Sequence, residues 1–130
     1  NWGDKCLIHN DLSEDNIILS ENKAHFIDFD FMCHGHCISD IASAAYYAAF
    51  AFPKNENGKI ESFVAHYKKF RNANINHQVL ILLIAHQNII NINFLVRRLT
   101  IEKKNFEHDL LKSLIDTNQR IRVLIGETYK

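Results

Sequence analysis

A dense polar segment at residues 9–16 lies between two short apolar runs at residues 6–8 and 17–19. It contains an acid and an amide five residues apart, Asp11 and Asn16, which can converge on one point when the segment curls. A carboxylate held there can accept the proton of a hydroxyl group, and an amide oxygen can bind a cation that is itself bound to phosphate. The spacing therefore predicts chemistry that joins a hydroxyl group, a divalent cation and a phosphate.

A second acidic motif, Ile27-Asp28-Phe29-Asp30, places Asp28 twelve residues after Asn16. Asp28 lies near the end of residues 24–29, which we expect to be extended, and an unpaired carboxylate buried there would be costly. We therefore expect a metal or another cation beside Asp28. Asp30 can assist the metal or a water molecule, and it can equally face solvent. Each motif alone is weak, but the order His-x-Asp-Leu-x-x-x-Asn followed by Asp-Phe is a specific joint signal for a kinase.

Two runs resemble the small-molecule kinases of the aminoglycoside phosphotransferase, choline kinase and homoserine kinase type. Residues 9–18 are similar to the catalytic loop of these proteins, and residues 27–42 to their metal-binding strand and the helix start that follows. The close resemblance covers residues 7–52. It implies a phosphotransferase that uses ATP and Mg²⁺, or Mn²⁺, to phosphorylate a hydroxyl of a small metabolite.

The same resemblance implies a role for each polar residue of the two runs. Asp11 would be catalytic, while Asn16 and Asp28 would hold the metal. His9 would fix the loop against the Asp28 segment, and Asp40 would brace the loop through backbone amides. Asp40 also suits the first turn of a helix, where an acid favours the helix dipole, so both interpretations make it a supporting residue.

The run Cys33-His34-Gly35-His36-Cys37 holds four potential zinc ligands within five residues. Structural zinc sites usually space their ligands as separate knuckles, and adjacent residues cannot easily all face one centre. We expect instead a loop across the mouth of the site, in which His34 or His36 could contact substrate or phosphate. A zinc-binding interaction module remains a less favoured alternative.

The chain changes to helical patterns after residue 38. Apolar residues recur at three and four positions, the spacing of helices with one buried face. Ser39 is an expected N-cap of the first helix, which Pro53 and residues 55–58 should end, and the last helix should be capped near Asn105. The expected helices lie at residues 39–52, 60–70, 79–99 and 105–124. We predict an α+β, mostly helical domain, with a short β-hairpin region packed on about four helices.

The resemblance identifies this domain as the C-terminal, catalytic lobe of a protein-kinase-like fold. The Gly-rich loop and the ATP-anchoring lysine of the nucleotide-binding N-terminal lobe do not occur in these residues, so that lobe is an expected partner. The alternative is a catalytically silent, kinase-like binding or scaffold domain.

Composition narrows the kinds of partner and the cellular locations that we expect for this chain. The 130 residues, 47% of them hydrophobic, suffice for one domain, and 15 basic and 15 acidic residues cancel. We therefore expect neither nucleic acid nor a membrane as a partner. The apolar stretch at residues 79–84 soon meets polar residues, so we do not expect it to span a membrane. Three cysteines are an odd number, which favours a reduced, cytoplasmic setting.

The acceptor is expected to be small. Only eleven residues separate Asp28 from Asp40, too few for the activation segment on which protein kinases dock a peptide. The later helices should instead wall a compact pocket over Asp11. Possible contacts for a cationic or polar acceptor are Tyr46, Tyr47, Glu56, Glu61 and His66.

Overall fold

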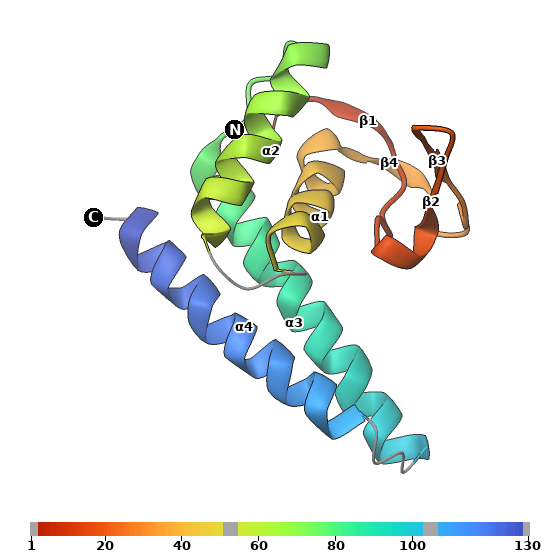
Figure 1. Cartoon of the computed structure of the whole chain (residues 1–130), viewed down its shortest axis with the longest axis vertical. Helices are drawn as coiled ribbons and strands as arrows, with labels where there is room; N and C mark the ends of the chain where they lie inside the picture. Colours follow the sequence, from red (N-terminus) through yellow and green to blue (C-terminus); the bar gives the residue numbers. More distant parts are fainter. Residues whose placement is uncertain (1–2, 51–54, 103–106, 129–130) are drawn as a thin grey trace.

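A computed structural model describes residues 3–50, 55–102 and 107–128. Within these residues, four short strands and a 3-10 helix precede four α-helices (Figure 1), so the mostly helical α+β architecture is confirmed. The strands are β1 (Lys5–Ile8), β2 (Ile17–Ser20), β3 (Lys23–Phe26) and β4 (Cys33–His36), and the 3-10 helix is Glu14–Asn16. The helices are α1 (Cys37–Phe50), α2 (Glu56–Phe70), α3 (His77–Glu102) and α4 (Glu107–Thr128).

The strands form two separate antiparallel pairs. Strands β2 and β3 make a hairpin whose two turn residues, Glu21 and Asn22, have φ values of 50° and 62°. Two successive positive φ angles match the right-handed twist of the strands, and Asn tolerates this conformation well. Strand β1 pairs with β4, which sets Ile8 opposite Cys33. The polar loop that follows Ile8 is therefore anchored at both ends by sheet pairing.

Two strand expectations are wrong. Strand β3 ends at Phe26, because the chain leaves the extended region and Asp28 adopts a φ of 60° in the loop beyond it. Residues 33–36 form strand β4 rather than a loop, because the backbone of β1 supplies the hydrogen-bonding partner that the sequence does not reveal.

Two helix boundaries also differ from expectation. Helix α1 begins at Cys37, so Ser39 lies within its first turn and does not cap it. Residues 56–58 belong to the first turn of α2 instead of ending α1, and the left-handed Asn55 (φ 55°) precedes them at the N-cap position. The expected helix end at Pro53 and the cap near Asn105 lie outside the described residues.

Helix α1 lies at the centre, with α2 and α3 packed on it and α4 running along α3 (Figure 1). The buried face of α1 carries alanines, which allow the neighbouring helices to approach closely. These alanines are Ala42, Ala45 and Ala49. Large aliphatic side chains of the other three helices fill the space around them, namely Ile60, Leu80, Ile81, Ile84 and Ile121.

Helix α3 is long and largely apolar. Its segment His77–Arg98 has a mean hydropathy of 1.9 and is 28% buried, so by length and composition alone it could cross a membrane. It also contains Asn88, a fully buried amide whose Oδ1 accepts a hydrogen bond from the Tyr46 hydroxyl at 2.9 Å. Asn88 Nδ2 donates to the carbonyl of Leu114 in α4 at 3.3 Å. These two hydrogen bonds join α1, α3 and α4. The expectation that this stretch does not span a membrane stays a prediction.

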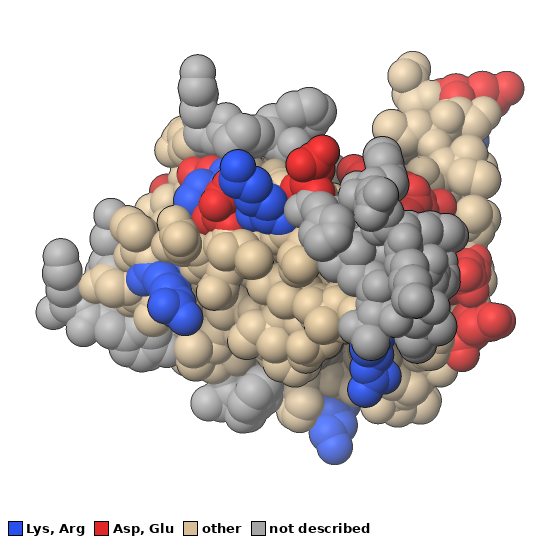
Figure 2. Space-filling view, turned by 90° about the horizontal axis from the view of Figure 1, so that it is seen from below, with Lys and Arg blue, Asp and Glu red and all other residues tan. Residues whose placement is uncertain are grey.

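Charged side chains of both signs are interspersed on the face drawn in Figure 2. The arrangement agrees with the equal numbers of acidic and basic residues in the chain. One ion pair links distant segments, because Arg120 of α4 donates to the carboxylate of Glu56 at the start of α2. The guanidinium of Arg120 also lies 5.3 Å from the centre of the Phe50 ring. These contacts attach α4 to the rest of the molecule.

Candidate active site

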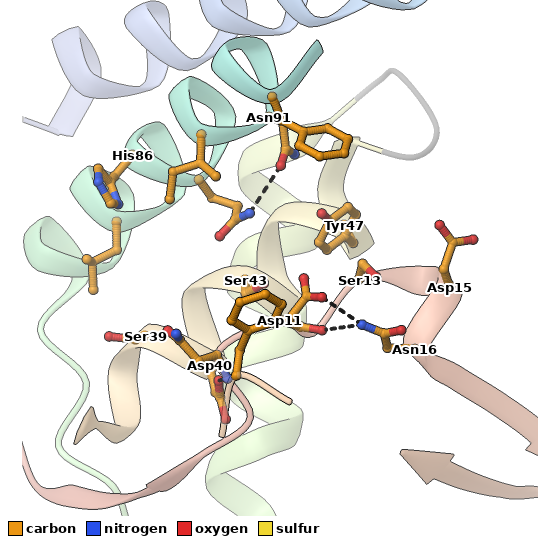
Figure 3. A pocket seen from close by; sticks show the side chains of 16 residues that line it. Asp11, Ser13, Asp15, Asn16, Ser39, Asp40, Ser43, Tyr47, His86 and Asn91 are labelled. Carbon is orange, nitrogen blue, oxygen red and sulfur yellow. Dashed lines mark hydrogen bonds between the residues drawn. The ribbon is translucent and has the colours of Figure 1, made fainter. Parts of the chain in front are cut away.

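The loop between β1 and β2 curls back on itself. The carbonyl of Asp11 accepts the amide of Ser13 at 2.9 Å, and the carbonyl of Ser13 accepts the amide of Asn16 at 3.2 Å. This curl returns Asn16 to Asp11 (Figure 3), where its Nδ2 donates to both the carbonyl and Oδ2 of Asp11, each at 2.9 Å. The acid and the amide are therefore in direct contact.

The two hydrogen bonds fix the orientation of the Asn16 carboxamide. Its nitrogen is committed to Asp11, while Oδ1 receives no hydrogen bond from any described residue. Asn16 is also largely buried. A fixed amide oxygen is a ligand of the kind that a hard divalent cation takes. Asn16 thus offers oxygen, rather than nitrogen, for binding.

Helix α1 holds the beginning and middle of the loop. The two carboxylate oxygens of Asp40 accept the backbone amides of His9 at 2.7 Å and Asn10 at 2.9 Å. Asn10 has a φ of 64°, a left-handed conformation that Asn adopts more readily than most residues other than glycine. One helical turn further on, the Ser43 hydroxyl donates to the carbonyl of Leu12 at 3.3 Å. Ser43 was not anticipated, although its position three residues after Asp40 places both on one helix face.

His9 ties the loop to the segment that contains Asp28. Its Nε2 donates to the carbonyl of Ile27 at 2.9 Å, because a carbonyl oxygen can only accept. The ring also packs against Phe29, with 4.9 Å between centres. The amide of Ile27 donates to the carbonyl of Asn16 at 3.1 Å. Both ends of the loop therefore hold Ile27, the neighbour of Asp28.

Asp28 and Asp30 are both exposed. Asp28 is therefore not a buried carboxylate that needs a cation to offset its burial, because the strand before it ends early. Neither acid lines the cavity described below. The positive φ of Asp28 is a strained conformation of the kind that often marks functional segments. Its role as a metal ligand stays a prediction.

The Cys33–Cys37 region does not gather into a metal site. In the extended strand β4, the side chain of Cys33 projects to one face, and those of His34 and His36 project to the other. Cys37 instead forms a disulfide with Cys6, which leaves Cys33 as an exposed free thiol. Across the part of the chain that the structure describes, no three His, Cys, Asp or Glu side chains are grouped to hold a metal ion. The zinc interpretation therefore has no support in the structure.

The two histidines of this strand, His34 and His36, do not line the cavity beside Asp11. His34 is exposed and His36 is half-buried. Pairing with β1 replaces the loop that was expected to bring them across the site mouth. The disulfide also shows that an odd number of cysteines does not exclude a bridge. The cytoplasmic location therefore stays a prediction.

A cavity of about 730 Å³ opens beside Asp11 and Asn16. Helix α1 forms one side and α3 the opposite side, as Figure 3 shows for Tyr47 and Asn91. Of the five substrate contacts considered from the sequence, Tyr47 alone lines this cavity. The others lie elsewhere: Tyr46 is buried, Glu56 pairs with Arg120, and Glu61 and His66 make contacts within α2.

The residues on the α3 side of the cavity are not among those predicted from the sequence. It presents His86, Gln87 and Asn91 among the apolar residues Leu83, Ile90 and Phe94. Gln87 Nε2 donates to Asn91 Oδ1 at 3.2 Å, so the two amides lie together on this wall. The signal in the sequence that could have indicated this wall is a pair of polar residues four positions apart within an otherwise apolar helix. That pattern cannot by itself distinguish a cavity wall from a solvent-facing stripe.

The cavity is electronegative. Burial raises the pKa of the Tyr47 hydroxyl, and the carboxylates of Asp11, Glu14 and Asp15 raise it further, against an opposing effect of Asn91. Tyr47 is therefore a neutral phenol at physiological pH and can donate a hydrogen bond. No Lys or Arg among the described residues lines the cavity. Neutral or cationic compounds are favoured in such a site over anions.

The domain thus presents an acid–amide loop to a cavity whose described lining residues include no Lys or Arg. Residues 2–71 match the model of the phosphotransferase enzyme family APH. The match covers more than half of the chain, and the chain belongs to this family. It includes the loop, Asp28 and Asp40, whereas α3 and α4 lie beyond it. Comparison with curated proteins and with solved structures gave no match.

Proposed function

We propose that this chain is the catalytic lobe of a protein-kinase-like enzyme that transfers the γ-phosphoryl group of ATP to a hydroxyl of a small metabolite. The observation that carries the proposal is the direct contact of Asp11 and Asn16 beside a cavity, in a member of a phosphotransferase family. The acceptor would be an amino alcohol, a hydroxy amino acid or a sugar.

Asp11 is the proposed catalytic base. Its Oδ2 accepts a hydrogen bond from Asn16, and its carboxylate lines the cavity in which an acceptor would lie. The acceptor oxygen would form a bond to the γ-phosphorus as the bond to the β,γ-bridging oxygen breaks and ADP leaves. Asp11 would take the hydroxyl proton as this bond forms.

Asn16 and Asp28 are the proposed ligands of Mg²⁺ or Mn²⁺. Both offer oxygen atoms, the donor that these hard cations prefer, and the Asn16 oxygen is already oriented by the two bonds from Nδ2. The ion would neutralise charge on the ATP phosphates. Asp28 is exposed, but Ile27 beside it is hydrogen-bonded to both Asn16 and His9. These bonds support a position for Asp28 close to the loop.

The cavity supports a small acceptor. The segment between Asp28 and Asp40 is largely taken up by β4, which pairs with β1, and by the start of α1, so little of it is left for the activation segment on which protein kinases dock a peptide. The amides of Gln87 and Asn91 and the phenol of Tyr47 suit hydroxyl groups, while nearby carboxylates suit an ammonium group. An anionic acceptor would meet Asp11 and Asp15 without a basic partner among the described lining residues.

We also propose that a nucleotide-binding N-terminal lobe completes the enzyme. The cavity wall provides no described lysine or arginine to pair with the phosphates of ATP. Kinases of this kind supply that positive charge from a second lobe, as the resemblance implies. Alone, the 130 residues are expected to bind ATP poorly.

A substrate screen tests the proposed function. The chain joined to such a lobe should phosphorylate one or more small alcohols among choline, ethanolamine, homoserine, hexoses and aminoglycosides, with ATP and Mg²⁺, and should not phosphorylate generic protein substrates. Asp11→Asn serves as the inactive control in every assay. Phosphorylation of proteins but of none of the alcohols would overturn the acceptor assignment. ATP binding with no transfer to any substrate would favour a silent binding domain.

A further inference from the structure

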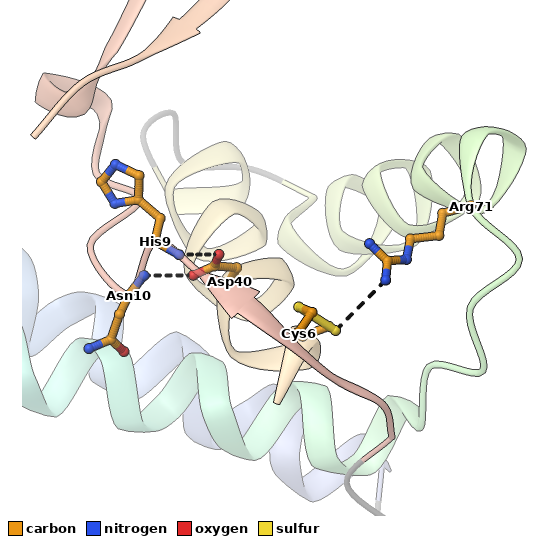
Figure 4. Close-up of a disulfide and its surroundings, with 6 residues drawn as sticks. Cys6, His9, Asn10, Asp40 and Arg71 are labelled. Atoms are coloured by element: carbon orange, nitrogen blue, oxygen red, sulfur yellow. Dashed lines mark hydrogen bonds between the residues drawn. A yellow bond between two sulfur atoms is a disulfide. The ribbon is translucent and has the colours of Figure 1, made fainter. Parts of the chain in front are cut away.

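We propose that Cys6 and Cys37 form a reversible thiol–disulfide site that controls the loop carrying Asp11. Cys6 lies in β1 and Cys37 is the first residue of α1, with 5.4 Å between their Cα atoms across 31 residues of sequence. The two sulfurs are joined in the structure (Figure 4). The connection to catalysis rests on the proposed function, whereas the redox chemistry does not.

The disulfide lies beside the hydrogen bonds that hold the loop. Cys6 precedes His9 by three residues, and Cys37 precedes Asp40 by three residues. Asp40 in turn accepts the amides of His9 and Asn10, as Figure 4 shows. The covalent bridge and these hydrogen bonds therefore connect the same two segments. When the bridge is reduced, the hydrogen bonds must hold the start of the loop without it.

The two cysteines stay close without the bridge. In the ladder between β1 and β4, Cys6 is opposite Gly35, two residues before Cys37. The amide of Cys37 also donates to the carbonyl of Asp4 at 2.9 Å. This backbone pairing holds both residues in register, so forming the bridge in the folded chain requires little further loss of chain entropy. The bridge can then open and close without unfolding.

The surroundings favour reaction with a small thiol compound. Cys6 and Cys37 both line a cavity of about 500 Å³, and Arg71 lines it too. The Nη2 atom of Arg71 lies 4.0 Å from the sulfur of Cys37. A neighbouring guanidinium stabilises the thiolate, which is the attacking species in disulfide exchange. It would also attract the carboxylates of glutathione.

Oxidation by glutathione disulfide proceeds in two exchange steps. The Cys37 thiolate attacks one glutathione sulfur, which forms a mixed disulfide and releases one glutathione thiolate. The Cys6 thiolate then attacks the sulfur of Cys37 and releases the second glutathione thiolate. Two electrons pass from the two cysteines to one glutathione disulfide, and the two cysteine protons are taken up by the released thiolates. Excess reduced glutathione reverses both steps.

The test compares the 130-residue chain equilibrated with reduced glutathione and with glutathione disulfide. Thiol labelling after denaturation, with mass analysis, should count three reactive cysteines in the reduced chain. In the oxidised chain it should find Cys6 and Cys37 joined, and Cys33 either free or carrying one glutathione. Hydrogen exchange should show the amides of His9 and Asn10 exchanging roughly tenfold faster after reduction, because local opening becomes easier. Neither measurement requires phosphoryl transfer, so failure here is distinguishable from failure of the proposed function.

Variants separate the site from general effects of oxidation. Cys6→Ser and Cys37→Ser should abolish the redox dependence of exchange, whereas Cys33→Ser should retain it. Arg71→Met should slow oxidation several-fold, since it removes the charge beside the thiolate, and Lys69→Met in the last turn of α2, just before Arg71, should not. If a serine variant fails to fold, the comparison of the reduced and oxidised natural chain still shows whether the bridge controls exchange of the loop amides.

Three outcomes would overturn the proposal. Three reactive thiols after treatment with glutathione disulfide would exclude the bridge as a product of that reaction. Resistance of the bridge to excess dithiothreitol in the folded chain would make it a permanent structural bond. If the His9 and Asn10 amides exchanged at equal rates in the two states, the bridge would have no effect on the loop.

Discussion

Asp11 and Asn16 touch each other, yet they offer different atoms to a ligand. Asn16 donates through nitrogen to Asp11 and keeps its oxygen available, whereas Asp11 presents a carboxylate to the cavity. If Asp11 is the base and Asn16 a metal ligand, their substitutions should affect different measurements. At the scale of single residues, the two roles are therefore experimentally separable.

Asp11→Asn in the two-lobed enzyme should lower turnover by about 10²-fold or more, the effect of losing a general base. The affinity for ATP should change little, because the carboxamide keeps the size of the side chain and one oxygen. Steady-state kinetics together with a nucleotide titration measure both quantities. Asp116→Asn, at an exposed position on α4, is the matched control. Near-normal turnover of Asp11→Asn would remove Asp11 from the role of base.

Asn16→Ala and Asp28→Asn should each weaken binding of Mn²⁺ in the presence of nucleotide, because each removes or weakens an oxygen ligand of a hard cation. Titration followed by paramagnetic resonance or calorimetry measures the dissociation constant. Glu21→Gln, in the turn between β2 and β3, changes one exposed carboxylate away from the loop and should leave binding unchanged. Unaltered titrations in both the Asn16→Ala and the Asp28→Asn variant would contradict the metal assignment.

Helix α1 is the element that positions the loop and also forms one side of the cavity. Asp40, Ser43 and Tyr47 follow one another at spacings of three and four residues, which places them on one face of the helix. The first two contact the loop backbone, and all three line the cavity. The alanines of α1 pack into the core. One helix therefore connects the stability of the core with the shape of the site.

Asp40→Ala should destabilise the domain by about 1–3 kcal/mol, because the amides of His9 and Asn10 lose their acceptors. Asp40→Asn should cost less, since it keeps one of the two oxygens. Denaturant unfolding measures both effects, with Asp116→Ala as the control on an exposed surface. An unfolding free energy of Asp40→Ala equal to that of the parent would show that water replaces the carboxylate.

At the scale of the whole molecule, a buried polar connection joins three helices. The Tyr46 hydroxyl donates to Asn88, and Asn88 donates to the carbonyl of Leu114. Burial raises the pKa of the Tyr46 hydroxyl to about 12, from its ordinary value of 10.0. The neutral phenol therefore stabilises the folded state fully below pH 10, and this contribution is lost as the pH rises through 12.

Raising the pH from 10 to 12 should lower the unfolding free energy of the natural chain by about 2 kcal/mol more than that of Tyr46→Phe, because the variant has no phenol to ionise there. At neutral pH the same variant should be less stable by about 1–3 kcal/mol, since Asn88 loses its buried donor. Unfolding curves across this pH range measure both effects. Parallel pH profiles of the two proteins would contradict the assigned burial of the hydroxyl.

Local patterns in the sequence by themselves determined several features of this protein. Apolar periodicity predicted four helices, because a helix must bury one face and repeats every three to four residues. The spacing of Asp11 and Asn16 predicted that they meet, because both belong to one short loop whose backbone can curl only within narrow limits. The paired motifs carried enough local information for the family resemblance, which the family match confirms.

The tertiary structure decided what depends on contacts between distant segments. Strand β4 exists because β1 pairs with it, and the bridge between Cys6 and Cys37 follows from that pairing. The cavity wall on α3 faces Asp11 because of the way α1 and α3 pack, which periodicity does not specify. Helical spacing tells which residues share a face, but only packing against other elements decides whether that face meets a core, a cavity or water.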